Sequence, residues 1–257
     1  MTHTPKSDFL HVMQQRGFMK DCTDLERLDA VMQAIYLVFN EGYSRIQDAR
    51  LERGSLIEVA IRLGRIVSRL FRHHPDPRSL LALMLLTAAR LPARLDSSGT
   101  FVPLDRQDRS LWRRDMIKEG VALIDAVYAA RHLPSAYQIQ AAISAIHSGA
   151  ERASDTDWAQ IAALYGKLEE YDASPAVCVN RAVALGRCGE IAAALRLLED
   201  PTLARRMERY QPYFAALGLC YKLAGERPSA RGAIERAIEL SDSAAQRAHL
   251  KQELLDL

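Results

Sequence analysis

Apolar residues recur every three to four positions along almost the whole chain, and no stretch alternates between apolar and polar residues as a half-buried strand would. This pattern predicts an all-α protein. Clusters of Pro, Gly, Ser and Asp separate the periodic stretches. The predicted helices cover residues 7–16, 24–41, 55–72, 77–91, 109–131, 135–149, 155–171, 175–187, 190–199, 207–223, 226–240 and 243–256. Residues 92–108 lack the periodicity, and we interpret them as a candidate functional loop.

The last third of the chain contains an internal repeat that has the spacing of tetratricopeptide (TPR) units. The second unit places these residues at the TPR positions: Phe214, Leu217, Gly218, Tyr221, Gly225, Ala230, Ile234 and Ala237. The small Gly218 and Ala230 would let two antiparallel helices approach closely, and the larger side chains would fill the space between them. The first unit, 36 residues upstream, is more degenerate, because Arg181 stands where the second has Leu217. Its matching residues are Ala182, Leu185, Gly189, Ala194 and Leu198.

These patterns predict a helical bundle that continues into a TPR-like α-solenoid. We divide the chain into residues 1–27, an N-terminal helical appendage, residues 28–150, the bundle, and residues 151–257, the repeats. A final helix near 244–255 would cap the array, as stacked repeats require. The 257 residues, 49% of them hydrophobic and 26% charged, supply enough material for such a core.

Charge and cysteine usage narrow the class of protein. The net charge is only +2, from 34 basic and 32 acidic residues, whereas proteins that bind nucleic acid through phosphate contacts usually carry a larger basic excess. Acidic residues interrupt the one arginine-rich stretch, which favours a solvated helix surface over a nucleic-acid site. That stretch contains Arg45, Arg50, Arg53, Arg62, Arg65, Arg69 and Arg72. The four cysteines form no CxxC pair, which is typical of free thiols in a reducing cytoplasm.

Membrane insertion is not expected from this sequence. The most apolar run, residues 80–91, is shorter than the roughly 20 residues that cross a bilayer. No secretory signal is apparent at the start of the sequence. We therefore predict a cytoplasmic protein without a membrane partner.

Several segments together resemble a known family, the extracytoplasmic-function sigma factors of RNA polymerase, in the long TPR-containing extension at their C-terminus. The segments follow the family's order: 28–31 (LDAV), 36–44 (YLVFNEGYS), 60–65 (AIRLGR), 80–90 (LLALMLLTAAR), 107–112 (QDRSLW), 117–124 (IKEGVALI), 137–147 (YQIQAAISAIH), 155–165 (DTDWAQIAALY) and 174–185 (SPAVCVNRAVAL). The resemblance covers about residues 28–257. It implies a role in the regulation of transcription initiation.

The start of the sequence departs from that family. A sigma factor would carry two promoter-reading domains before this region, and only 27 residues precede Leu28. We therefore expect no promoter recognition by the chain itself and no direct contact with DNA. Residues 6–29 instead resemble the opening of bacterial tyrosyl-tRNA synthetases. Neither a HIGH-type nor a KMSKS-type motif follows, so the resemblance carries no aminoacylation activity with it.

Motifs for catalysis, metal binding or cofactor binding are weak. The sequence lacks GxGxxG, Walker A and GxSxG patterns, and we predict neither an enzyme nor a cofactor. Asp155 and Asp157 could hold a metal, but capping of the helix that begins beside them is the simpler interpretation. His73 and His74 fall in a Pro-rich turn without further ligands at metal spacing. His147 is favoured as a semi-buried histidine with a partner.

Polar residues inside the apolar helices are the remaining candidates. If buried, they must satisfy one another, so we expect inter-helix ion pairs or hydrogen bonds, such as one between Arg65 and Asp108. The same residues could instead line a concave groove, but structural bridging is the favoured interpretation. The candidates are Asn40, Glu41, Tyr43, Arg62, Arg65, Asp108, Arg109, Trp112, Tyr137, Gln140, His147, Asp157, Trp158, Asn180 and Arg181.

The favoured hypothesis is a protein-interaction module that binds sigma-factor domains or RNA polymerase in a concave groove. We expect Asn180, Arg181, Tyr213 and Tyr221 to lie in that groove. Two alternatives stay open. One is a nucleic-acid-binding protein that uses the arginine-rich helices, and the other is a small-molecule-binding or enzymatic domain around His147. The oligomeric state does not follow from the sequence.

Overall fold

The computed structural model describes residues 25–44, 53–97 and 99–257. These residues form helices and loops, and the single isolated β-bridge among them joins Leu95 to Phe101 within the loop expected at residues 92–108. The all-α fold class is therefore confirmed. The helix expected at residues 7–16 lies outside the described residues, as does Cys22. None of the described helices is both long enough and apolar enough to span a bilayer.

The N-terminal half is a bundle of helices around α4. Its helices are α2 (Leu25–Ser44), α3 (Arg53–Leu70), α4 (Pro75–Ala88), α5 (Arg114–Ala129) and α6 (Ala136–Gly149). Short 3-10 helices η1 (Leu91–Ala93), η2 (Arg109–Leu111) and η3 (Ala153–Asp155) lie in the connections. Helix α4 packs against α2, α3, α5 and α6, which explains why its apolar residues occur on all sides.

The C-terminal half consists of paired helices. They are α7 (Trp158–Leu168), α8 (Pro175–Arg187), α9 (Ile191–Leu198), α10 (Pro201–Arg206), α11 (Gln211–Ala224), α12 (Arg227–Glu239) and α13 (Ala244–Leu255). Gly225, at a φ of 79°, ends α11 in the left-handed conformation that glycine adopts without strain. The reversal that follows lays α12 against α11.

The expected close approach of α11 and α12 is confirmed. Gly218 and Ala230 are buried at the crossing, and a Cβ atom on Gly218 would lie 2.6 Å from Cγ1 of Ile234. Ala182, Ala194 and Leu198 are likewise fully buried in the preceding pair, α8 and α9. The repeat pattern thus marks real contacts between helices.

Several helix boundaries differ from the prediction by a few residues, and two differences are larger. The predicted helix 109–131 is interrupted, because the backbone amide of Arg113 donates a hydrogen bond to the carbonyl of Ala89 at the end of α4, and α5 begins only after it. Helix α10 was not predicted, because residues 200–206 fell between the predicted helices 190–199 and 207–223. Oδ1 of Asp200 accepts hydrogen bonds from the amides of Thr202 and Leu203, while Pro201 occupies the first turn of α10.

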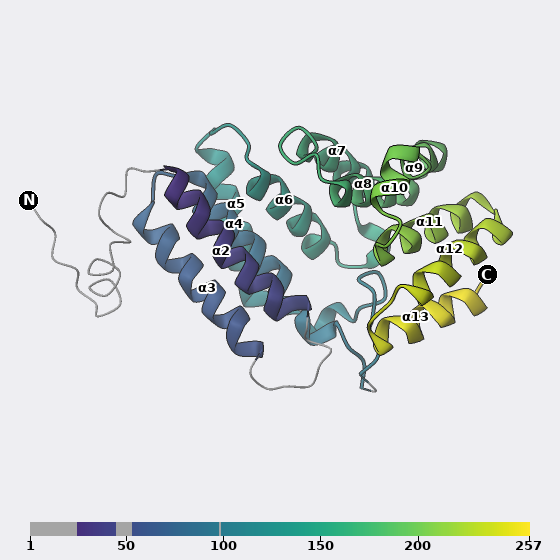
Figure 1. Cartoon of the computed structure of the whole chain (residues 1–257). Coiled ribbons are helices and arrows are strands. Elements are labelled where there is room, and N and C mark those ends of the chain that lie inside the picture. The colour runs from purple at the N-terminus through teal and green to yellow at the C-terminus, as the bar shows by residue number, and fades with distance from the viewer. Residues whose placement is uncertain (1–24, 45–52, 98) are drawn as a thin grey trace, which may run out of the picture.

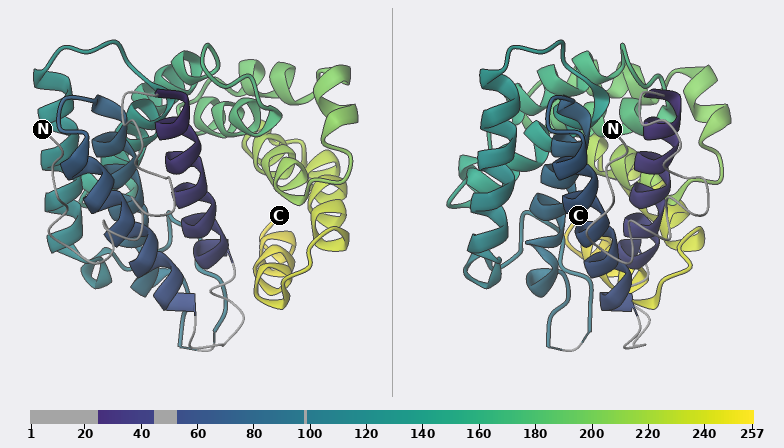
Figure 2. Two further views of the ribbon diagram at one scale, coloured as in Figure 1. Left: turned by 60° about the vertical axis from the view of Figure 1, so that its left-hand side comes forward. Right: turned by 90° about the vertical axis from the view of Figure 1, so that its left-hand side faces the viewer.

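The helices follow a curved path in space (Figures 1 and 2). The bundle forms one arm, α7 to α10 form the middle, and α11 to α13 form the other arm, so that α2 and α13 lie at opposite ends of the curve in the left view of Figure 2. The connection between η1 and η2 leaves the bundle and reaches α13, as the ion pairs described below also show.

We predict that Gly218→Ala lowers the free energy of unfolding by about 1–3 kcal/mol, because the added methyl group would overlap the branched side chain of Ile234. Gly232→Ala in α12 is the matched control, since a Cβ atom there meets nothing within 4 Å. The control should raise stability by up to about 1 kcal/mol through helix propensity. Urea denaturation measures both changes. Equal stabilisation by the two substitutions would contradict a tight crossing.

Candidate functional site

Two adjoining cavities form a groove on the inner side of the C-terminal helices. Their volumes are about 360 and 330 Å³, and both are lined by Ala215, Leu219, His249 and Leu250. We call this combined feature the repeat groove. The remaining residues of the first cavity are Phe101, Val179, Asn180, Val183, Gln211, Pro212, Ala216 and Gln246. Those of the second are Pro103, Asp105, Arg106, Arg187, Gly218, Lys222, Leu223, Ile234 and Glu253.

Helices α8, α11 and α13 supply most of the lining, and the connection at residues 94–108 supplies the rest. Ala215 and Leu219 are four residues apart and therefore lie on one face of α11. Apolar side chains are mixed with the amides of Asn180, Gln211 and Gln246 at one end of the groove. A surface of this composition can hold apolar anchors of a polypeptide and also donate or accept hydrogen bonds.

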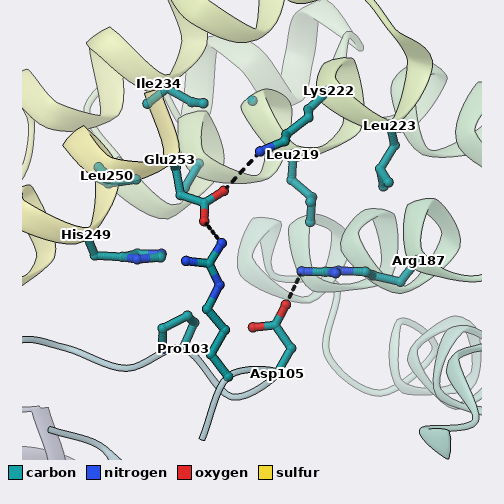
Figure 3. Close-up of a pocket in the computed structure, with 13 residues that line it drawn as sticks. Pro103, Asp105, Arg187, Leu219, Lys222, Leu223, Ile234, His249, Leu250 and Glu253 are labelled. Carbon is teal, nitrogen blue, oxygen red and sulfur yellow. Dashed lines mark hydrogen bonds and ion pairs between the residues drawn. The ribbon is translucent and has the colours of Figure 1, made fainter. Parts of the chain in front are cut away.

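The 94–108 loop is held to the repeat groove by ion pairs (Figure 3). Arg106 pairs with Glu253 of α13, which also lies 3.5 Å from Nζ of Lys222. Asp105 accepts a 2.7 Å hydrogen bond from Nη2 of Arg187 at the end of α8. The side chains are partly exposed, so each pair contributes only about 0–1 kcal/mol.

Aromatic contacts extend this attachment. The ring of Phe101 meets the ring of His249 edge-on at 6.0 Å between centroids. Burial lowers the pKa of His249, and the opposing charges of Glu253 and Arg106 act on it as well. At the base of the loop, Nε1 of the buried Trp112 donates to Gln107, and Gln107 donates to the carbonyl of Val102.

Arg94 fixes the other end of the loop to the bundle. Its guanidinium lies 3.9 Å from the centre of the Tyr43 ring and donates a 2.8 Å hydrogen bond to the carbonyl of the same residue. Tyr43 in turn stacks on the buried Phe39. The loop is therefore fixed to the bundle by half-buried groups and to the repeats by partly exposed charges.

A third cavity, of about 320 Å³, lies where the bundle meets the repeats. Asn180 lines it as well as the repeat groove. The hydroxyl of Tyr36 donates to Oε1 of Gln140 at 3.4 Å, and burial raises the pKa of Tyr165 to about 12. Nearby, burial lowers the pKa of Arg90, and the phenols of Tyr43 and Tyr165 act against that shift.

The expected pair of Arg65 with Asp108 is wrong. Arg65 instead forms a two-bond ion pair with Glu119 of α5, through Nη2 at 2.6 Å and Nε at 3.1 Å. Asp108 caps η2, because its Oδ1 accepts the amide of Ser110 at 2.9 Å. Hydrogen bonds from the hydroxyl of Ser110 and, second, from its amide keep the pKa of Asp108 below its usual value.

Arg109 bridges helices, although its partners are carbonyl groups. Its Nη1 donates to the carbonyls of His147 and Ala150, at 2.8 and 2.6 Å, which caps the end of α6. Its guanidinium also lies 4.6 Å from the ring centre of Trp112. This buried arginine joins the end of the 94–108 loop to α6, the last helix of the bundle.

His147 is a packed histidine. Its ring meets Trp158 edge-on at 5.1 Å, and none of the cavities described above is lined by it. Burial, followed by the charges of Arg90 and Arg109, lowers its pKa to about 3.

Of the four residues expected in the groove, only Asn180 lines it. Tyr213 is buried between helices and donates a 2.7 Å hydrogen bond to the carbonyl of Leu198. Tyr221 donates to Glu199 at 2.9 Å, and Arg181 pairs with Glu169. Those three residues bridge neighbouring helices because their side chains follow the packed faces of α8 and α11.

The remaining candidates lie at several separate places. Tyr137 meets Tyr36 edge-on at 5.9 Å, and Asn40 is hydrogen-bonded to the hydroxyl of Tyr36. Asp157 caps α7 by accepting the amide of Gln160 at 2.8 Å, as expected. Asn40, Glu41, Arg62 and Asp157 are exposed. Among the described residues no group of His, Cys, Asp and Glu is placed to hold a metal.

The sequence did not single out the residues that attach the loop to the groove. Arg106, Arg187, His249 and Glu253 are ordinary surface types at unremarkable spacing, and they come from three distant parts of the chain. The one available signal was the absence of helical periodicity over residues 92–108. It indicated the loop but not its partners.

Comparison with known proteins relates the chain to a family and to a longer curated protein. Residues 27–128 match a family of unknown function (DUF6596). An uncharacterized protein of Rhizobium meliloti, R00370, is 44% identical over 229 residues, which are 89% of this chain and 53% of that protein. The chain therefore spans about half the length of this curated relative. No solved structure matches the chain.

The resemblance to tyrosyl-tRNA synthetases is confirmed as a short, partial match. The tyrosine–tRNA ligase of Cereibacter sphaeroides is 44% identical over 59 residues, and that of Dinoroseobacter shibae is 42% identical over 59 residues. Each match covers 23% of this chain and only 14% of the ligase.

We predict that Arg106→Gln loosens the loop without unfolding the protein. Hydrogen exchange at the amides of Val102 and Arg106 should accelerate by about fivefold, because a partly exposed ion pair contributes about 1 kcal/mol at most. Arg152→Gln is the control, since it removes only the local pair with Asp155. If both variants exchanged like the wild type at these amides, the ion pairs would not hold the loop.

We predict a loss of stability in mild acid that depends on His147. The folded protein binds a proton there only near pH 3, whereas the unfolded chain binds one near its ordinary value of 6.5. Stability is therefore lost as the pH falls through that window, by up to about 2 kcal/mol between about pH 7 and about pH 5. Urea denaturation over this range should show a smaller slope for His147→Gln. Substitution of the exposed His132 is the control, and an unchanged slope in His147→Gln would refute the prediction.

Proposed function

We propose that the chain is a protein-interaction module that binds a segment of another polypeptide in the repeat groove. The observation that supports it best is the groove itself, in which two adjoining cavities run along α8, α11 and α13. Apolar side chains line both cavities, together with amide side chains in the first and charged side chains in the second. A peptide in such a groove would place apolar side chains on Ala215 and Leu219 and hydrogen-bond to Asn180 and Gln246.

The proposed partner is a sigma-factor domain or RNA polymerase. This choice rests on the likeness of residues 28–257 to the extension of extracytoplasmic-function sigma factors. The same likeness leads us to propose a cytoplasmic location and a role in transcription regulation. The relative from Rhizobium meliloti suggests a polypeptide with which to test the proposal. Because this chain covers 53% of it, the remainder of that protein is a natural first polypeptide to test.

The 94–108 loop fits this proposal as the element that adjusts the groove. It lines both cavities and is held to α8 and α13 by partly exposed charges that salt weakens. A bound segment would contact the loop as well as the helices. The loop would therefore become more ordered on binding.

We predict that the part of the Rhizobium meliloti protein outside the match binds this chain in trans, measured by isothermal titration calorimetry. Asn180→Ala with Gln246→Ala should weaken binding by about tenfold, because two hydrogen bonds at the groove are lost. Ala215→Tyr, which fills the groove, should weaken it further. Asp115→Asn on the exposed face of α5 is the control.

Two outcomes would count against the proposal. One is the absence of binding both by that polypeptide and by purified RNA polymerase. The other is binding that the groove substitutions leave unchanged, which would place the contact on another surface.

A further inference from the structure

A cavity of about 280 Å³ lies between the end of α3, the start of α4 and the connection from α5 to α6. It shares no residue with the repeat groove or with the cavity beside Tyr36. We call it the basic pocket. Its lining residues are Arg72, His73, His74, Pro75, Arg78, Val127, Ala130 and His132.

The charges in the basic pocket are of one sign. Two arginines and three histidines line it, and no carboxylate does. Nε of Arg72 donates to the carbonyl of Arg69, and Nη2 of Arg78 donates to the carbonyl of Arg72. Within the part of the chain that the structure describes, neither guanidinium has a carboxylate partner, so both keep unused donors and an uncompensated charge.

His74 is oriented by the helix that it caps. Its Nδ1 accepts the amide of Asp76 at 3.3 Å, so the neutral ring carries its proton on Nε2, which is a donor. Pro75 and Pro77 have no amide hydrogen, and the start of α4 therefore offers few backbone donors. Any anion in the basic pocket would be bound mainly by side chains.

We propose that the basic pocket binds the phosphate group of a small molecule. A phosphate brings up to two negative charges and several acceptor oxygens, which matches two guanidinium groups and a set of imidazole donors. A carboxylate brings one charge and two oxygens, and would leave more of these donors unused. The walls formed by Val127 and Ala130 give a small organic group attached to the phosphate an apolar surface to contact.

The test is isothermal titration calorimetry of the whole chain with inorganic phosphate and with glycerol 3-phosphate, at neutral pH and constant ionic strength. Acetate is the comparison anion. We expect at least one phosphate probe to bind, and we expect the affinity for acetate to be lower by about tenfold or more. Tighter binding of glycerol 3-phosphate would identify a phosphate ester as the source, and tighter binding of inorganic phosphate would identify the free anion.

Variants locate the binding. Arg72→Gln with Arg78→Gln should lower the phosphate affinity by about tenfold or more. Arg62→Gln, which removes one exposed arginine from α3 outside the pocket, should leave it unchanged. Circular dichroism checks that each variant is folded. If the double variant does not fold, nitrogen-15 shifts of the imidazoles of His74 and His132 in the wild type provide the readout.

Three results would overturn the proposal. The first is that neither phosphate probe binds at about 10 mM, a concentration at which weak anion contacts are detected. The second is an equal loss of affinity in Arg62→Gln. The third is that the imidazole signals do not move when phosphate is added. Failure of the peptide-binding experiment on the repeat groove would leave this test unaffected, because the two sites share no residue.

Discussion

The burial of α4 at the centre of the bundle is the constraint on which the rest of the structure depends. Ten of its 14 residues are buried, and four helices pack around it. Gly120 of α5 lies so close to Leu86 that a Cβ atom there would come within 2.7 Å of the Leu86 side chain. Because the 94–108 loop begins one 3-10 turn after α4, this packing also fixes where the loop starts on its way to α13. The geometry of the repeat groove therefore depends on the core of the bundle.

Most of the fold could be predicted from hydrophobic periodicity, because burial selects the same spacing wherever a helix has one covered face. The prediction failed at residues 109–113 and missed α10, because local hydrogen bonds decide where these helices begin. The candidate site was harder to predict from the sequence. Periodicity places residues on a helix face but does not give the angles between helices, so it could not choose Glu119 over Asp108 as the partner of Arg65.

Because periodicity does not give the angles between helices, it also could not identify most residues of the repeat groove. Tyrosine is a residue type that is common in binding sites, yet Tyr213 and Tyr221 both donate hydrogen bonds to neighbouring helices. Asn180 was placed correctly because its neighbours on α8 left it on the open face. The two proposed sites differ in chemistry accordingly. The repeat groove has apolar lining residues that suit a polypeptide, and the basic pocket has basic lining residues that suit a small anion.

The ion pair between Arg106 and Glu253 joins residues 147 positions apart, whereas the helix pairs are joined by short connections. Local contacts form faster than distant ones, because less chain entropy is lost in closing a short segment. The bundle and the hairpins can therefore assemble before this bond exists. Since the ribosome makes Arg106 long before Glu253, the loop can pair with α13 only after the helices between them have been synthesised. A nascent chain would thus expose α8 to α12 for a time without the loop attached to α13.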